Sequence, residues 1–288
     1  MKSQAVWGVH ERLAGAFDLP LLPEERFFRL LEFAGLGEDE ARTMRLDAER
    51  LLDDAADWVR EAYDALARYP DTAKALGWET HVLESSLYLR RAFFSAWLAR
   101  TIGVDTSKDF ARYLHHAGRV HAGFGPEARE VPEEWVGMAF AFILGKFSEK
   151  VAPERLPLWG AYLKAQEGVM LRGQVLAEDL KKGAVPVRFS VMGVARRHWK
   201  TPIDLRLEEA TLLRLVEKVF AFAPELVDAA LEPVPAAEEA GLWMEEVTRW
   251  RFKPGWTLLV EGRDARHLEG LKTPLAPEVR VELLPPGR

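Results

Sequence analysis

The stretch that decides the fold is TSKDFARYLHHAGRVHAGFGP, residues 106–126. Its apolar residues Phe110, Leu114 and Ala117 recur at helical spacing, and His121 follows four residues later, so the four side chains share one face of a helix. A histidine that closes an apolar face has two interpretations. It is either a core histidine hydrogen-bonded to backbone, or a metal ligand that projects into an apolar pocket. Spacing alone leaves both open.

The ends of this helix are also marked. Thr106 and Asp109 have the spacing of a capping box, which predicts that the helix begins at Thr106. Gly123, Gly125 and Pro126 predict its end.

Helical periodicity extends over the chain on both sides and predicts a largely helical domain over residues 1–182 with no strand. The other helices are expected at residues 23–33, 38–49, 46–69, 83–103, 132–147 and 153–180. Helical spacing stops at Lys181–Ala184, and residues 185–191 alternate as a strand does. Residues 183–288 therefore predict a small α+β domain, with helices at 207–222 and 224–231, a Pro-rich turn at 232–235 and strands at 256–260 and 279–283.

The length and composition of the chain limit the classes of protein to which it can belong. A length of 288 residues fits about two domains, and 48 % hydrophobic with 29 % charged residues supports a sizeable core. A net charge of −6 does not favour a dedicated nucleic-acid binder. The absence of cysteine excludes disulfides, thiolate-ligated haem, cysteine-held metals and cysteine nucleophiles.

Amide residues are scarce as well. The chain has no asparagine and three glutamines, Gln4, Gln166 and Gln174, and with abundant Glu, Arg and Pro this composition is typical of a thermophile. Residues 1–14 show no signal-peptide pattern, and the most apolar stretch, residues 135–147, is too short to cross a bilayer. We therefore expect a soluble, cytoplasmic protein.

The order of motifs from about residue 25 to 180 resembles the globin-coupled sensors and protoglobins. AGRVH at residues 117–121, then Gly-Phe-Gly and Trp135, is similar to the family's haem-ligand region. GLGEDEA at residues 35–41 resembles its entry into the first globin helix, and AADWVREAYDAL at residues 55–66, followed by YPDT, resembles its second. The resemblance implies a fold that is mainly α, with a globin-like N-terminal domain.

What the resemblance implies for the site is specific. His121 matches the proximal ligand of haem b iron, and Tyr63 matches the distal tyrosine that hydrogen-bonds a bound gas. Leu114 and Ala117 would lie under the proximal haem face. The distal wall is expected to contain Phe93, Phe94 and Trp97. Where the family often has an aromatic residue before this tyrosine, the chain has Ala62, which implies a roomier pocket.

The remaining candidate side chains favour structural roles. His115 and His116 point away from the His121 face on a helical wheel, which predicts that both are solvated. The other histidines, His10, His81, His198 and His267, belong to no convincing ligand set. A basic cluster around Trp199, namely Arg196, Arg197 and Lys200, is either a solvated loop, which the charge balance favours, or a nucleic-acid contact. The tryptophans of the C-terminal part, Trp243, Trp250 and Trp256, are expected in a core.

Three functional hypotheses follow. The first is a gas sensor that binds O₂, NO or CO and transmits its state to residues 183–288, as a homodimer through helices 132–147 and 153–180. The second is a haem enzyme that consumes NO, peroxide or O₂. It is less favoured because no distal histidine lies near Phe93 to Trp97. The third is a haem-free helical interaction module.

Overall fold

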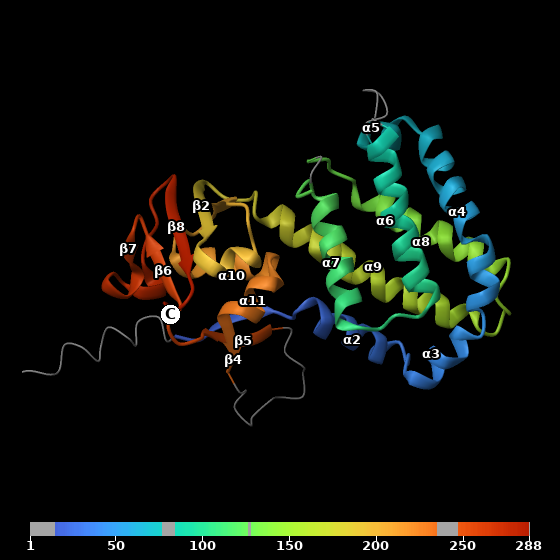
Figure 1. Cartoon of the computed structure of the whole chain (residues 1–288), viewed down its shortest axis with the longest axis horizontal. Helices are drawn as coiled ribbons and strands as arrows, with labels where there is room; N and C mark the ends of the chain where they lie inside the picture. Colours follow the sequence, from blue (N-terminus) through green and yellow to red (C-terminus); the bar gives the residue numbers. More distant parts are fainter. Residues whose placement is uncertain (1–14, 77–83, 126–127, 235–246, 288) are drawn as a thin grey trace, which may run out of the picture. The chain divides into compact units, whose positions relative to one another are not determined.

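The computed structural model describes residues 15–76, 84–125, 128–234 and 247–287, and the chain folds as two compact units (Figure 1). The first is a helical unit, Pro23–Val175. The second is a mixed unit, which combines Leu176 onward with the residues up to Leu22. The fold is mainly α, with a C-terminal α+β part, as the sequence predicts.

The helical unit follows the predicted order of elements. Its helices are α2 (Pro23–Phe33), α3 (Glu38–Arg45), α4 (Ala48–Arg68), α5 (Pro70–Ala75), α6 (Glu84–Ile102), α7 (Lys108–His121), α8 (Glu133–Ser148) and α9 (Leu156–Asp179). Pro70 ends α4 and opens α5, because proline is tolerated only in the first turn of a helix. The predicted N-cap of α7 is off by one residue. Ser107, not Thr106, accepts a hydrogen bond from the amide of Phe110, at 3.2 Å.

A buried carboxylate stands between α3 and α4. The prediction of one helix over 38–49 is wrong, since α3 ends at Arg45 and α4 begins at Ala48. Asp47, in the break, is 1 % exposed. Its carboxylate accepts hydrogen bonds from Arg155 Nε at 2.9 Å and from Trp159 Nε1 at 3.2 Å. The break therefore attaches the start of α4 to the two residues near the start of α9.

Glycines bring α7 and α9 into close contact. A Cβ at Gly118 of α7 would lie 1.9 Å from the carbonyl oxygen of Met170, and one at Gly173 of α9 would lie 2.3 Å from that of His115. Only glycine fits at both positions, so the two backbones pack directly on each other.

The mixed unit is built on a five-stranded sheet. Its strands are β2 (Val185–Val191), β3 (Ile203–Leu207), β6 (Thr257–Val260), β7 (Arg263–Asp264) and β8 (Val279–Leu284), in the order β3-β2-β8-β6-β7. The central pair, β2 and β8, is parallel, and the other pairs are antiparallel. With α10 (Leu212–Phe222) between the second and third strands, this is the β-grasp arrangement.

A second, three-stranded sheet corrects two predictions. It has the order β1-β5-β4, with β1 (Phe17–Pro20), β5 (Val247–Phe252) and β4 (Leu231–Pro233). The expectation of no strand before residue 182 is wrong, because β1 finds its partner some 230 residues later in β5. The Pro-rich segment expected as a turn begins as β4.

The predicted helix at 207–222 also starts too early. Residues up to Leu207 form β3, and α10 begins after Thr211, whose side chain accepts a hydrogen bond from the amide of Arg214. The next helix, α11 (Pro224–Ala230), lies as predicted. None of the helices in the described part of the chain is long and apolar enough to cross a bilayer.

Candidate functional site

An aromatic cluster joins three helices of the helical unit. The ring of Tyr63 on α4 lies 6.2 Å from that of Phe94 on α6, and Trp97 lies 5.2 Å from Phe94. Trp97 in turn lies 5.2 Å from Phe140 of α8, and each pair meets edge to face. Leu114 belongs to the same buried core, and Phe94 and Ala117 pack against it.

The Tyr63 phenol remains protonated. Burial raises the pKa of Tyr63 to about 12, and the neighbouring charges of Arg90 and Arg91 oppose this rise only in part. The Arg91 guanidinium lies 5.6 Å from the centre of the tyrosine ring. At neutral pH the Tyr63 hydroxyl therefore keeps its proton and can act as a hydrogen-bond donor.

His121 is the last residue of α7 and is partly buried. Burial lowers the pKa of its imidazole to about 4, so the ring is neutral at physiological pH. Its Nδ1 atom is buried and has no hydrogen-bond partner among the described residues. A neutral imidazole with an unpaired ring nitrogen has the chemistry of a metal ligand.

The backbone of His121 is connected to α9 through Val131, which lies in the loop before α8. The Val131 amide donates to the His121 carbonyl oxygen at 2.7 Å, and residues 122 and 130 form an antiparallel bridge. The Val131 carbonyl accepts a hydrogen bond from Gln174 Nε2 at 2.8 Å. Two successive hydrogen bonds thus join α9 to the C-terminal end of α7.

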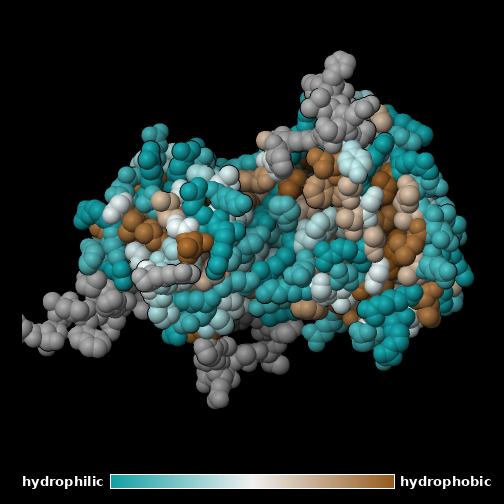
Figure 2. Space-filling model, in the orientation of Figure 1, coloured by the Kyte–Doolittle hydropathy of each residue, from teal (hydrophilic) through white to brown (hydrophobic). Residues whose placement is uncertain are grey.

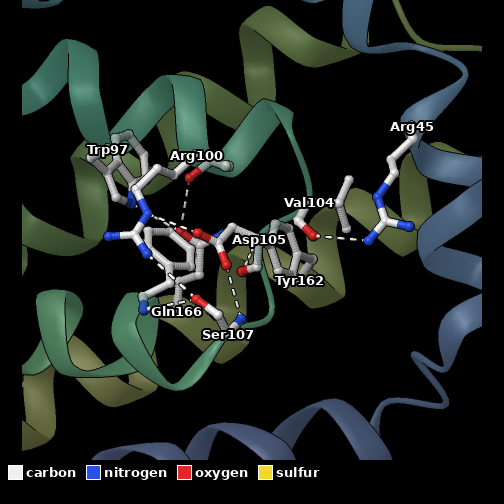
Figure 3. A network of polar contacts seen from close by, with 10 residues as sticks. Arg45, Trp97, Arg100, Val104, Asp105, Ser107, Tyr162 and Gln166 are labelled. Carbon is white, nitrogen blue, oxygen red and sulfur yellow. Dashed lines mark hydrogen bonds and ion pairs between the residues drawn. The ribbon is translucent and has the colours of Figure 1, made fainter.

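On the α6 side, α9 holds the aromatic cluster through another glutamine. Trp97 Nε1 donates to Gln166 Oε1 at 2.9 Å, and the Thr101 hydroxyl donates to the same oxygen at 3.0 Å. Figure 3 shows this contact within a larger polar network. The network continues to the loop after α6, where the Tyr162 hydroxyl donates to the Asp105 carbonyl at 2.7 Å.

The structure brings most of the predicted haem-site side chains together. Tyr63, Trp97 and Leu114 are buried in one core. Two are not among its residues. Phe93 is 63 % exposed, and His121 at the end of α7 is partly buried but does not belong to this core. Successive residues of a helix lie about 100° apart, so Phe93 and Phe94 do not face the same neighbours.

His115 is not solvated, which corrects the prediction made from the helical wheel. Its side chain is 2 % exposed, whereas His116 is exposed as expected. The wheel identified the core-facing side of α7 but not the second side, where Gly173 of α9 contacts the His115 backbone. Neither His115 ring nitrogen has a hydrogen-bond partner among the described residues. Its pKa is lowered well below 6.5, by burial first and then by neighbouring cationic groups.

The other candidates of the sequence analysis lie in the mixed unit or outside the described residues. Trp199 packs edge to face on Phe222 at 5.4 Å, while Arg196, Arg197 and Lys200 are exposed. Trp250 is buried in β5. The predictions for His10, His81 and Trp243 fall outside the described residues. The described residues contain no group of three or more His, Asp or Glu side chains placed to hold a metal ion.

Gln166 and Gln174 were not identified as site residues from the sequence. Their contacts join segments far apart in the chain, which periodicity cannot reveal. One signal was nevertheless present, because glutamine is scarce in this chain and two of its three copies lie within nine residues.

A comparison with models of known protein families finds a match in the helical unit. The family model described as Protoglobin matches residues 23–158, which lie within the helical unit. No curated protein matches the chain.

Proposed function

We propose that the protoglobin domain identified by this match binds haem through His121 and a diatomic gas beside Tyr63. Globin-type domains of this kind bind haem and small gas ligands in general. His121 rather than the equally neutral His115 is assigned because residues 117–121 resemble the family's haem-ligand region, and the state of His121 suits that role. Its imidazole is neutral, and its Nδ1 is buried without a hydrogen-bond partner among the described residues.

The chemistry of the donor set fits an iron porphyrin. The porphyrin supplies four nitrogen ligands, so one protein imidazole is sufficient to hold the iron. When bound, the haem iron supplies an open coordination position for O₂, NO or CO. Leu114, Ala117, Phe94 and Trp97 offer apolar surface to a porphyrin and restrict the access of water.

Tyr63 is proposed as the polar contact on the distal side. Its protonated hydroxyl can donate a hydrogen bond to a gas ligand that carries partial negative charge, which favours O₂ over CO. The exposed Phe93 is not required for this role.

The finer proposals concern the cofactor type and signalling. We propose haem b, because the chain has no cysteine for thioether attachment. Ligand binding that favours one arrangement of α7 over another would shift α8 and α9, and α9 continues into the mixed unit. A homodimer through α8 and α9 would place this shift at an interface, and Met138 of α8 is 59 % exposed there. Cytoplasmic location stays a prediction.

A haem enzyme is the second candidate. Tyr63 could support NO dioxygenation if a reductase supplied electrons, whereas peroxidase chemistry usually requires a distal acid–base pair. Steady NADH-coupled consumption of NO or peroxide would favour the enzyme over the sensor.

The test of the proposed function is an absorbance spectrum. The protein is expressed with haem supplementation, and the reduced-minus-CO difference spectrum is recorded for the wild type, His121→Ala and His116→Ala. We expect a Soret band in the wild type and in His116→Ala, whose side chain is exposed on the same helix, and its loss or large change in His121→Ala. A folded wild-type protein that stays colourless would favour the haem-free interaction module.

A further inference from the structure

We propose that Gln166 and Gln174 are positioning residues that tie α9 to both faces of the haem site. Gln166 acts on the distal side through Trp97, and Gln174 acts on the proximal side through Val131 and the backbone of His121. This inference rests on the proposed function and adds the contacts by which one helix senses both sides of the pocket.

The two side chains are placed where glutamine is rarely found. The chain has three glutamines in 288 residues, and these two are 0 % and 2 % exposed. Burying a side-chain amide without hydrogen bonds lowers the stability of the fold, so a glutamine in a core is expected to have a polar partner there. Each of the two amides has such a partner, Trp97 Nε1 for Gln166 and the Val131 carbonyl for Gln174.

The orientation of the Gln166 amide is fixed by its partner. An indole N–H is only a donor, so the Gln166 atom that faces Trp97 Nε1 must be the oxygen. The contact sets the rotation of the Trp97 indole, which meets Phe94, and Phe94 meets Tyr63. The path from α9 to the distal tyrosine therefore contains two aromatic contacts and one hydrogen bond.

The Gln166 contact is also incompletely satisfied. Gln166 Nε2 is buried and has no hydrogen-bond partner among the described residues. The side chain therefore acts through its oxygen, which accepts hydrogen bonds from both Trp97 and Thr101.

The orientation of the Gln174 amide is fixed in the opposite sense. A backbone carbonyl is only an acceptor, so Gln174 must present Nε2 to Val131. The amide of the same residue, Val131, donates to the His121 carbonyl. Movement of the end of α7 is thereby passed to α9 through one peptide unit and one side chain.

The spacing of the two glutamines lets α9 contact two separate points of the candidate site. Eight residues of α-helix span about 12 Å, so α9 contacts the two sides of the site at well-separated points. If a gas ligand changes the separation of α6 and the end of α7, the two contacts cannot both keep their geometry on a rigid helix. One of them must yield or α9 must move, and α9 continues at Leu176 into the mixed unit.

The experiment uses the full chain loaded with haem and the variants Gln166→Met and Gln174→Met. Methionine keeps the length of the side chain and removes the hydrogen bond. Distal and proximal effects are read separately, as the C–O stretching frequency of the CO complex and the iron–histidine stretching frequency of the reduced protein. We expect Gln166→Met to shift the first and not the second, and to raise the O₂ dissociation rate about fivefold, the equivalent of one hydrogen bond. Gln174→Met should shift only the second.

Two further measurements separate positioning from loosening of the core. Gln166→Glu keeps an acceptor oxygen for Trp97, and because burial favours the neutral, protonated carboxyl, this variant should retain the wild-type C–O frequency. In haem-free protein, hydrogen exchange should become faster at the Trp97 indole in Gln166→Met and at the Val131 amide in Gln174→Met.

The outcomes distinguish this inference from the proposed function. Wild-type frequencies in both variants, or the same shift of both frequencies in each, would overturn the inference and leave haem binding intact. A wild-type protein with no Soret band would instead overturn the proposed function, and the inference with it.

Discussion

The Tyr63 hydroxyl is protonated at neutral pH, and burial moves its pKa further from that range, so it can act as a hydrogen-bond donor to a bound gas. For Tyr63→Phe we expect O₂ to dissociate about tenfold faster, which corresponds to the loss of a hydrogen bond of about 1.4 kcal/mol, with CO dissociation little changed. The shape of the ring is preserved, so its contact with Phe94 remains. Stopped-flow measurement of both gases checks the prediction, and unchanged O₂ kinetics would contradict the distal role.

The carboxylate of Asp47 gives the helical unit a pH dependence in acid. Burial alone would raise the pKa of this carboxyl, but the hydrogen bonds from Arg155 and Trp159 lower it by more. The net pKa therefore lies below the usual 3.8. Because the folded-state pKa is depressed, the stabilisation is present above about pH 4 and disappears as the pH falls through the folded-state value. Asp47→Asn should therefore lower the free energy of unfolding by about 1.5–3 kcal/mol at pH 7, the range for a hydrogen bond to a charged group, and by less at pH 3.

The matched control for this variant is Asp57→Asn, which makes the same change of charge on α4. Asp57 pairs with Arg60 on the surface, and such exposed pairs contribute about 0–1 kcal/mol. Urea unfolding followed by circular dichroism at both pH values compares the two. Equal losses in both variants would show that the buried contacts of Asp47 do not stabilise the unit.

Single residues were predictable where one helical face determines their surroundings. Leu114 and Phe110 are fully buried, as their spacing requires. His115 was misjudged because α7 is covered on two sides, and a helical wheel carries no information on the second neighbour. The assignments of His121 and Tyr63 came from family resemblance and stay predictions until the spectra are measured.

At the scale of elements, the contact of α7 with α9 depends on glycine. Gly118→Ala would place a methyl group 1.9 Å from the Met170 carbonyl oxygen, so the helices must separate. We expect a loss of about 1–3 kcal/mol in the free energy of unfolding, since overpacking outweighs the better helix propensity of alanine.

The same substitution at Gly145 of α8 is the control. A Cβ there meets nothing within 4 Å, so Gly145→Ala should stabilise the helix by about 0.5–1 kcal/mol. Chemical unfolding of both variants gives the comparison. If Gly118→Ala proved as stable as Gly145→Ala, the close contact of α7 and α9 would be refuted.

Elements with a local signal were predicted well, and those that depend on remote partners were not. The helices α6, α8 and α9 and the strand β2 lie within a few residues of their expected bounds, because Gly103, Pro132, Pro153 and Gly183 mark where they begin or end. The strands β1 and β4 have four and three residues, too few to show alternation. Their pairing with β5 is a property of the folded chain.

At the scale of the whole molecule, apolar surface is distributed unevenly. Figure 2 shows hydrophobic side chains gathered on the visible face of the helical unit, over α6 and between α4 and α8. Among the exposed large apolar residues of these helices are Leu89 and Phe93 of α6, Leu52 of α4 and Met138 of α8. Patches of this kind often mark contact surfaces. Of these residues only Met138 lies on a helix of the proposed α8–α9 homodimer interface, so the patch on α4 and α6 is a separate apolar surface.

The chain order of the two units leads to the last prediction. The mixed unit needs β1 from before the helical unit, where Leu19 is 1 % exposed and β1 contacts α10. Leu19→Ala should cost about 2–5 kcal/mol and act on the mixed unit alone. Hydrogen exchange should become faster in β1, β5 and α10 while α4 to α8 keep their protection. Asp18→Ala removes only a surface pair with Arg249 and should leave both units unchanged. Equal loss of protection in the helical unit would mean that the two units unfold together, and the assignment of β1 to a separate unit would be wrong.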